Sequence, residues 1–134
     1  MATSSLTSVA FFIFLLHLAT SVSSIDVNYG TLGDNLPSLQ LVANFLKTKT
    51  TIDSVKIFDV SPQILQAFAG SCISITITAP NGDIPALTNL DSARQWIMAH
   101  IKPFHPQTKI KYILIGSKVL HWTDWNTIKV LVLP

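Results

Sequence analysis

The chain has 134 residues and a formal net charge of +2, with 49% hydrophobic and 12% charged residues. This length predicts one domain at most. The composition makes long-range disorder and polyanion binding poor interpretations. No run of basic residues could follow a nucleic-acid backbone, so we expect no nucleic-acid partner. All seven acidic residues are aspartates, and the chain therefore contains no glutamate.

The first 24 residues differ from the rest of the chain. They carry no charged side chain, and residues 9–19 form an apolar stretch that is shorter than the roughly 20 residues of a membrane span. Small polar residues follow, and Val22 and Ser24 suit the cleavage site of a secretory signal. We therefore expect residues 1–24 to be a signal peptide and the mature chain to be secreted, with no stable membrane span. A retained membrane anchor is the alternative.

Residues 25–134 alternate short apolar runs typical of strands with amphipathic segments typical of helices. In chain order, we expect a strand over 25–30, a helix from Pro37, a strand over 54–60 and a short helix from Pro62 that ends at Gly70. A strand over 73–78 follows, and Pro80, Asn81 and Gly82 close it with a turn. The last two elements are a helix from an Asp91 N-cap through Ile101 and a strand over 110–116. Residues 127–133 fit a helix or a strand equally well.

This order predicts an α/β fold with a parallel sheet and right-handed crossovers. Two architectures compete, namely a small doubly wound sheet and part of a (β/α)8 barrel. A whole barrel takes roughly 250 residues, so this chain supplies less than half of one. No glycine pattern typical of a dinucleotide or phosphate site follows the first strand, which weakens a nucleotide-binding interpretation.

Cys72 is the single cysteine, so no intrachain disulfide forms. It begins an apolar run, and we expect a buried, inert thiol there. An activated nucleophile needs a cationic neighbour or a positioned histidine, and the nearby sequence offers neither.

Functional residues of parallel α/β sheets gather at the carboxyl ends of the strands. Here those ends carry aromatic and short polar side chains that suit carbohydrate, because rings stack on sugar faces while polar groups bind hydroxyls. The candidate binding residues are Asn28, Tyr29, Phe58 and Asp59. Simple packing of Tyr29 and Phe58 between strands and helices is the alternative.

At these positions the sequence resembles a known family. The segments IDVNYGTLGDNLP, SVKIFDVSPQILQAFAGSCISITITAPNGDIPAL and YILIGSKVLHW closely resemble the plant glucan endo-1,3-β-glucosidases of glycoside hydrolase family 17. The resemblance covers essentially all of residues 25–129. It implies a secreted (β/α)8 barrel, here about its first four βα units, that cuts 1,3-β-glucan of the cell wall with retention of configuration. It also implies that Tyr29 and Phe58 line the substrate groove, and we expect no cofactor and no metal.

The chain departs from the family at the catalytic motif. After the fourth strand the family has Gly-Asn-Glu-Val, in which Glu is the general acid/base and Asn binds substrate, whereas this chain has Gly116, Ser117, Lys118 and Val119. Lys118 therefore stands at the acid position and Ser117 at the Asn position. The family's nucleophile follows a later strand that is absent here. Retaining hydrolysis needs two carboxyl groups, and an ammonium group beside an oxocarbenium-like transition state raises the barrier.

Other groups of candidate catalytic, metal-binding or sugar-binding residues give weaker predictions. Ser117, His121 and Asp124 lie close in sequence but lack the context of a nucleophile elbow. His100 and His105 straddle Pro103, so they are expected to be solvated surface residues rather than metal ligands. Trp122 and Trp125 either extend a sugar platform or pack against helices.

We therefore expect residues 25–134 to be the N-terminal half of a glucan endo-1,3-β-glucosidase-like barrel that is inactive as written. The alternative is a non-catalytic glucan-binding or wall-associated protein, or a fragment without function. We also expect self-association through the open sheet edges at 25–29 and 110–115.

Overall fold

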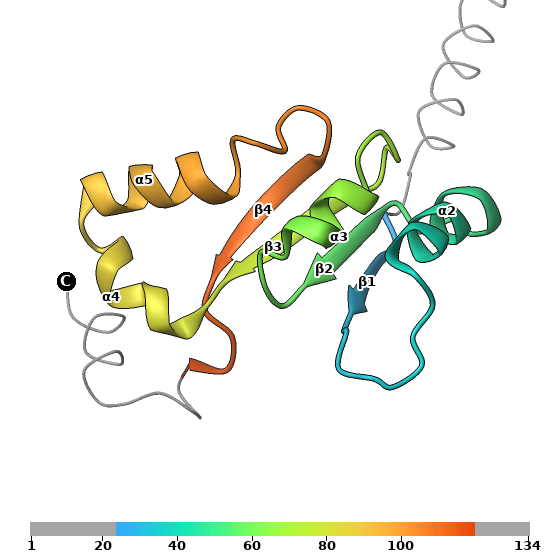
Figure 1. Cartoon of the computed structure of the whole chain (residues 1–134), viewed down its shortest axis with the longest axis horizontal. Helices are drawn as coiled ribbons and strands as arrows, with labels where there is room; N and C mark the ends of the chain where they lie inside the picture. The colour runs from blue at the N-terminus through green and yellow to red at the C-terminus, as the bar shows by residue number, and fades with distance from the viewer. Residues whose placement is uncertain (1–23, 120–134) are drawn as a thin grey trace, which may run out of the picture.

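A computed structural model describes residues 24–119, which form a four-stranded sheet and its connecting helices (Figure 1). The elements in chain order are β1 (Asp26–Tyr29), α2 (Leu39–Lys49), β2 (Ser54–Ile57), α3 (Pro62–Ala67), β3 (Ser74–Ala79), the 3-10 helix η1 (Asn81–Asp83), α4 (Ile84–Leu87), α5 (Leu90–His100) and β4 (Lys109–Ile115). The strands lie in the order β1-β2-β3-β4, and every neighbouring pair is parallel. The predicted α/β fold is therefore confirmed.

The two faces of the sheet differ in chemistry. Val55 and Ile57 of β2 and Ile75 and Ile77 of β3 are fully buried, and they pack with Phe68 in the main core. Side chains from α2, α3 and α5 pack against this same cluster, so the helices cover one face of the sheet. A doubly wound sheet carries helices on both faces, and the described residues therefore favour part of a barrel.

Side chains on the opposite face come from the alternate residues of each strand. One row across the sheet consists of Asn28, Lys56, Thr76 and Tyr112, which are partners in the register of successive strands. Tyr112 is 57% exposed, and Asn28 is exposed as well. This open face is consequently mixed in polarity rather than apolar.

Three helices begin at side chains that cap them. The hydroxyl groups of Ser38 and Ser61 accept from backbone N–H groups at the starts of α2 and α3. At the start of α5, the Asn89 side chain accepts from the N–H groups of Asp91 and Ser92, at 3.0 and 3.1 Å. The expected Asp91 N-cap is therefore wrong, because Asn89 is the residue whose backbone is still extended before the first turn.

The segment after β3 is more ordered than the closing turn predicted from Pro80, Asn81 and Gly82. It continues as η1 and the single-turn helix α4 before α5 begins. The apolar side chain of Ile84, at the start of α4, is buried, and this burial stabilises the turn.

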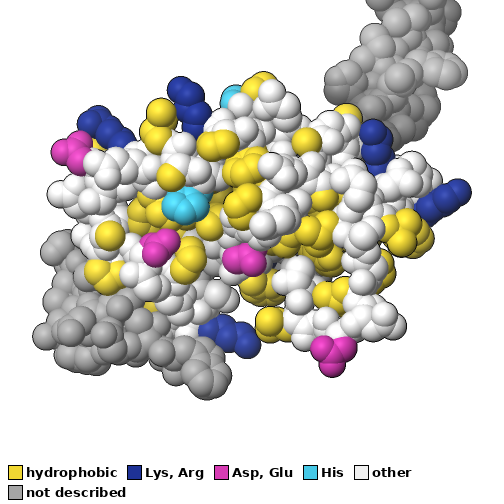
Figure 2. Space-filling view, in the orientation of Figure 1, with side chains coloured by type: hydrophobic (Ala, Val, Ile, Leu, Met, Phe, Trp, Pro, Cys, Tyr) yellow, Lys and Arg dark blue, Asp and Glu magenta, His cyan; other side chains and the backbone are white. Residues whose placement is uncertain are grey.

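The terminal strand β4 is largely uncovered on its outer side. Every residue from Lys111 to Ile115 is exposed, and Ile115 retains 47% of its accessible surface. Figure 2 shows apolar side chains across the middle of one face of the molecule, with lysine and arginine at its margins. A strand with this much apolar surface on a sheet edge is unusual for a soluble protein.

Residues 127–133, His121, Trp122, Asp124 and Trp125 lie outside the described residues, as does nearly all of segment 1–24. Among the helices of residues 24–119, none has the length and apolarity that a membrane crossing requires.

Candidate functional site

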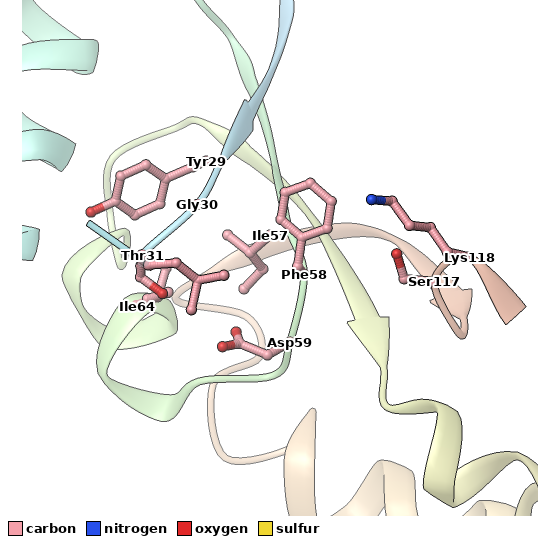
Figure 3. Close-up of a pocket in the computed structure, with 10 residues that line it drawn as sticks. Tyr29, Gly30, Thr31, Ile57, Phe58, Asp59, Ile64, Ser117 and Lys118 are labelled. Carbon is pink, nitrogen blue, oxygen red and sulfur yellow. The ribbon is translucent and has the colours of Figure 1, made fainter. Parts of the chain in front are cut away.

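A cavity of about 500 Å³ lies at the carboxyl ends of the strands, where the sequence places its candidate residues. Its lining comes from the end of β1 and the loop after it, from the end of β2, from α3 and from the segment after β4 (Figure 3). The lining residues are Tyr29, Gly30, Thr31, Leu32, Ile57, Phe58, Asp59, Ile64, Ser117 and Lys118. Of the four candidate binding residues and the two motif positions 117 and 118, all but Asn28 therefore line one cavity.

Tyr29 and Phe58 enter this cavity from different faces of the sheet. Tyr29 pairs with Ile57 in the register and packs against the core, and its buried hydroxyl finds no hydrogen-bond partner within residues 24–119. Phe58 follows Ile57 in the chain, so its side chain points to the opposite face of the sheet from Ile57, and it is 46% exposed. Phe58 thus offers an accessible ring, whereas Tyr29 lines the cavity with its hydroxyl buried.

Asp59 is the single carboxylate among the described lining residues. Its Oδ1 accepts a hydrogen bond from the N–H of Ser61 at 3.1 Å, which holds the side chain next to the start of α3. In Figure 3 this carboxylate lies below Ile57, on the far side of the cavity from Lys118. Asn28 lies outside the lining but neighbours Lys56 on the open face.

The segment carrying Ser117 and Lys118 is fixed by two reciprocal hydrogen bonds from Asn81. The N–H of Ser117 donates to Asn81 Oδ1 at 2.7 Å, and Asn81 Nδ2 donates to the Ser117 carbonyl at 3.0 Å. Gly116 precedes them with φ of +77°, and a Cβ there would lie 2.5 Å from Val119 Cγ2 and 2.8 Å from Ile84 Cδ1. This turn therefore requires glycine, and it brings Ser117 and Lys118 to the cavity.

The remaining candidates do not assemble into a second site within the described residues. Cys72 is exposed rather than buried, because its φ of +67° turns the side chain outward between buried Ser71 and Ile73. His100 is half-buried rather than solvated, since its ring stacks on Trp96 with centroids 4.7 Å apart. No group of three metal-ligating side chains occurs in residues 24–119.

Residues 25–134 match the family described as Glycosyl hydrolases family 17. The chain belongs to this family. A glucan endo-1,3-beta-glucosidase of Triticum aestivum is 49% identical over 82% of the chain, and a glucan endo-1,3-beta-D-glucosidase of Olea europaea is 41% identical over 93% of it.

Solved structures of this family match the same fold. The beta-1,3-glucanase CJP38, an allergen of Cryptomeria japonica pollen, superposes with a TM-score of 0.69 at 36% identity over 81% of the chain. The family 17 chain spans 25% and 28% of the lengths of the wheat and olive relatives and 33% of the CJP38 chain. Its parallel sheet is therefore part of a family 17 (β/α)8 barrel, as the sequence predicts.

The cavity also contains features that the sequence did not single out. Leu32 and Ile64 line it, and Asn81 supports it from outside. Asn81 follows the third predicted strand, so its place at the rim could be anticipated. Its pairing with Ser117, 36 residues later, leaves no local pattern in the sequence.

We predict that Asn81→Ala lowers the free energy of unfolding by about 1–3 kcal/mol, because it removes both hydrogen bonds to the main chain of Ser117. Asn81→Asp keeps the acceptor and should cost less. Urea unfolding at one protein concentration, followed by tryptophan fluorescence, measures both. Asn44→Ala, on the exposed side of α2, is the control, and equal stability of the Asn44 and Asn81 variants would contradict the prediction.

Proposed function

We propose that this family 17 chain binds 1,3-β-glucan at the strand-end cavity and does not hydrolyse it. The observation that carries the proposal is the charge of the lining, where Lys118 stands at the family's acid position and Asp59 is the single described carboxylate. Retaining hydrolysis uses two carboxyl groups about 5–5.5 Å apart. With no glutamate in the sequence, the acid/base position holds an ammonium group that cannot cycle as a carboxyl group does.

Binding has better support than catalysis, because side chains that only contact a sugar do not have to transfer a proton as a general acid/base does. The exposed face of Phe58 provides a stacking surface, and Ser117 and Asp59 provide polar groups at the same cavity. The names of the wheat and olive relatives, both glucan endo-1,3-beta-glucosidases, support 1,3-β-glucan as the ligand class. Asn28 extends the polar surface beside the cavity.

We predict that a soluble linear 1,3-β-glucan oligomer binds weakly in titration calorimetry and is recovered intact. A one-sided groove makes few contacts, and ordering the rim loops opposes binding. Phe58→Ala should weaken binding about tenfold, or about 1.4 kcal/mol, and Tyr29→Ala should weaken it too. Release of reducing ends should equal a buffer blank, even after Ser117→Asn and Lys118→Glu together, because these changes restore one carboxyl group and retaining hydrolysis needs a second one beside it.

Phe45→Ala is the matched control, because Phe45 is a similarly exposed phenylalanine on α2, outside the cavity lining. Tight binding that survives Phe58→Ala and Tyr29→Ala would place the site elsewhere. Reducing-end release that persists through repurification would overturn the non-catalytic assignment. Absence of any binding would favour a fragment without function.

We infer that residues 1–24 direct secretion and that residues 25–134 act outside the cell, in the extracellular space or the wall. The apolar stretch at 9–19 and the small residues up to Ser24 support this. Amino-terminal sequencing of protein exported from plant cells is the test. A first residue other than Ile25, or retention in the membrane fraction, would contradict the inference.

We also propose that the polypeptide pairs with a second copy of itself through the sheet edges. The edge strands carry opposite charges, with Asp26 on β1 and Lys109 and Lys111 on β4. Apolar side chains are exposed along β4, and pairing would cover them. Two copies joined in this way would place eight parallel strands in one closed sheet.

We predict a dimer or larger species in size-exclusion chromatography with light scattering. Leu114→Lys, which adds a charge to the exposed edge strand, should shift the population toward monomer. Leu90→Lys, at an exposed position on α5, is the control. A monodisperse monomer with a sharp cooperative melt would contradict self-association.

A further inference from the structure

The exposed ring of Phe58 has one lysine beside it and shares the lining of the cavity with a second. Lys56 precedes it by two residues on the same face, and Lys56 Nζ lies 4.8 Å from the centroid of the ring. Lys118 lines the same cavity from the segment after β4, and in Figure 3 its side chain extends to the Phe58 side of that segment. The two lysines are 62 residues apart in the chain, so the fold and not a local run of basic residues brings both to the end of the sheet that carries Phe58.

Neither Lys56 nor Lys118 forms an ion pair with a carboxylate of the described residues. Within residues 24–119 a single ion pair is present, between Arg94 and Asp91 on α5, so no described carboxylate lies within 4.0 Å of Lys56 or Lys118. The cavity's own Asp59 is engaged by the N–H of Ser61 and lies on the other side of Ile57. The Lys56 ammonium group therefore lies over the Phe58 ring without a carboxylate beside it, although the cavity as a whole contains one charge of each sign from Lys118 and Asp59.

A neutral glucan offers hydroxyl oxygens that accept hydrogen bonds from these ammonium groups, but it carries no negative charge to complement theirs. A uronic acid has the same ring face for stacking and carries a carboxylate at C6, on the rim of that ring. A sugar stacked on Phe58 would therefore present its carboxylate sideways, toward an ammonium group, and charge-assisted hydrogen bonds of this kind are about twice as strong as neutral ones. Lysine acts as a compact point charge and suits one carboxylate in several geometries.

We propose that Lys56 and Lys118 bind the carboxylate of a uronic acid residue in a 1,3-β-linked oligosaccharide that stacks on Phe58. This inference rests on the proposed binding function and specifies its ligand as an acidic sugar. The small net charge of +2 still argues against binding of long polyanions, and two local ammonium groups suit one carboxylate at a time.

The test is titration calorimetry of the full chain with two matched probes, a neutral 1,3-β-linked glucose pentasaccharide and the same pentasaccharide carboxylated at C6. We expect the carboxylated probe to bind about tenfold more tightly at low salt, with the advantage lost near 1 M salt, where the Debye length is about 3 Å. Lys56→Gln and Lys118→Gln should each reduce the ratio of the two affinities about threefold, in the range of partly exposed ion pairs.

Lys102→Gln is the control, because it removes the same charge from the connection that leads into the amino-terminal end of β4, at the other end of the strands from the cavity. It should leave the affinity ratio unchanged. A ratio at or below one with measurable neutral binding overturns the inference and leaves the proposed function standing. A high ratio that neither Lys56→Gln nor Lys118→Gln lowers also overturns it. Binding of the carboxylated probe alone supports the acidic ligand and contradicts a neutral-glucan function, and binding of neither probe overturns both.

Discussion

The isoleucine and valine side chains that β2 and β3 bury beneath α3 hold the sheet in one register. Val55, Ile57, Ile75 and Ile77 retain no accessible surface. A slip of one residue in either strand would move this row to the open face and expose it to water. Because that cost fixes the register, the carboxyl ends of the parallel strands stay level, and the residues that follow them meet at one rim. The cavity is therefore a consequence of burial on the other side of the sheet.

The same register determines what the open face offers. Residues that alternate with the buried row, such as Lys56 and Thr76, must lie opposite the helices. Phe58 continues this alternation past the end of β2, and for that reason its ring is accessible while the neighbouring Ile57 is buried. A charged side chain and an aromatic ring two residues apart on a strand thus become direct neighbours. The binding chemistry of the rim follows from strand geometry more than from loop shape.

The element order and the parallel sheet could be predicted because they depend on periodicity and turn residues within short windows. The start of α5 could not be settled in this way, since Asn89 and Asp91 are both good capping residues and only the backbone path selects Asn89. The exposure of Cys72 depends on one positive φ that an apolar run does not reveal. The convergence of Phe58, Asp59 and Lys118 could be anticipated from their places after strands. The sidedness of Tyr29 and Phe58 required the register itself.

Asn81 holds the rim through the main chain of residue 117 and makes no use of that residue's side chain. Any amino acid with a backbone N–H can therefore occupy this position without releasing the segment. The neighbouring turn depends on Gly116, which lies outside the reacting groups of the family motif. Selection on the fold and selection on the chemistry consequently act on different atoms. A lineage can lose hydrolysis at positions 117 and 118 and still inherit an intact rim on which a new ligand preference can evolve.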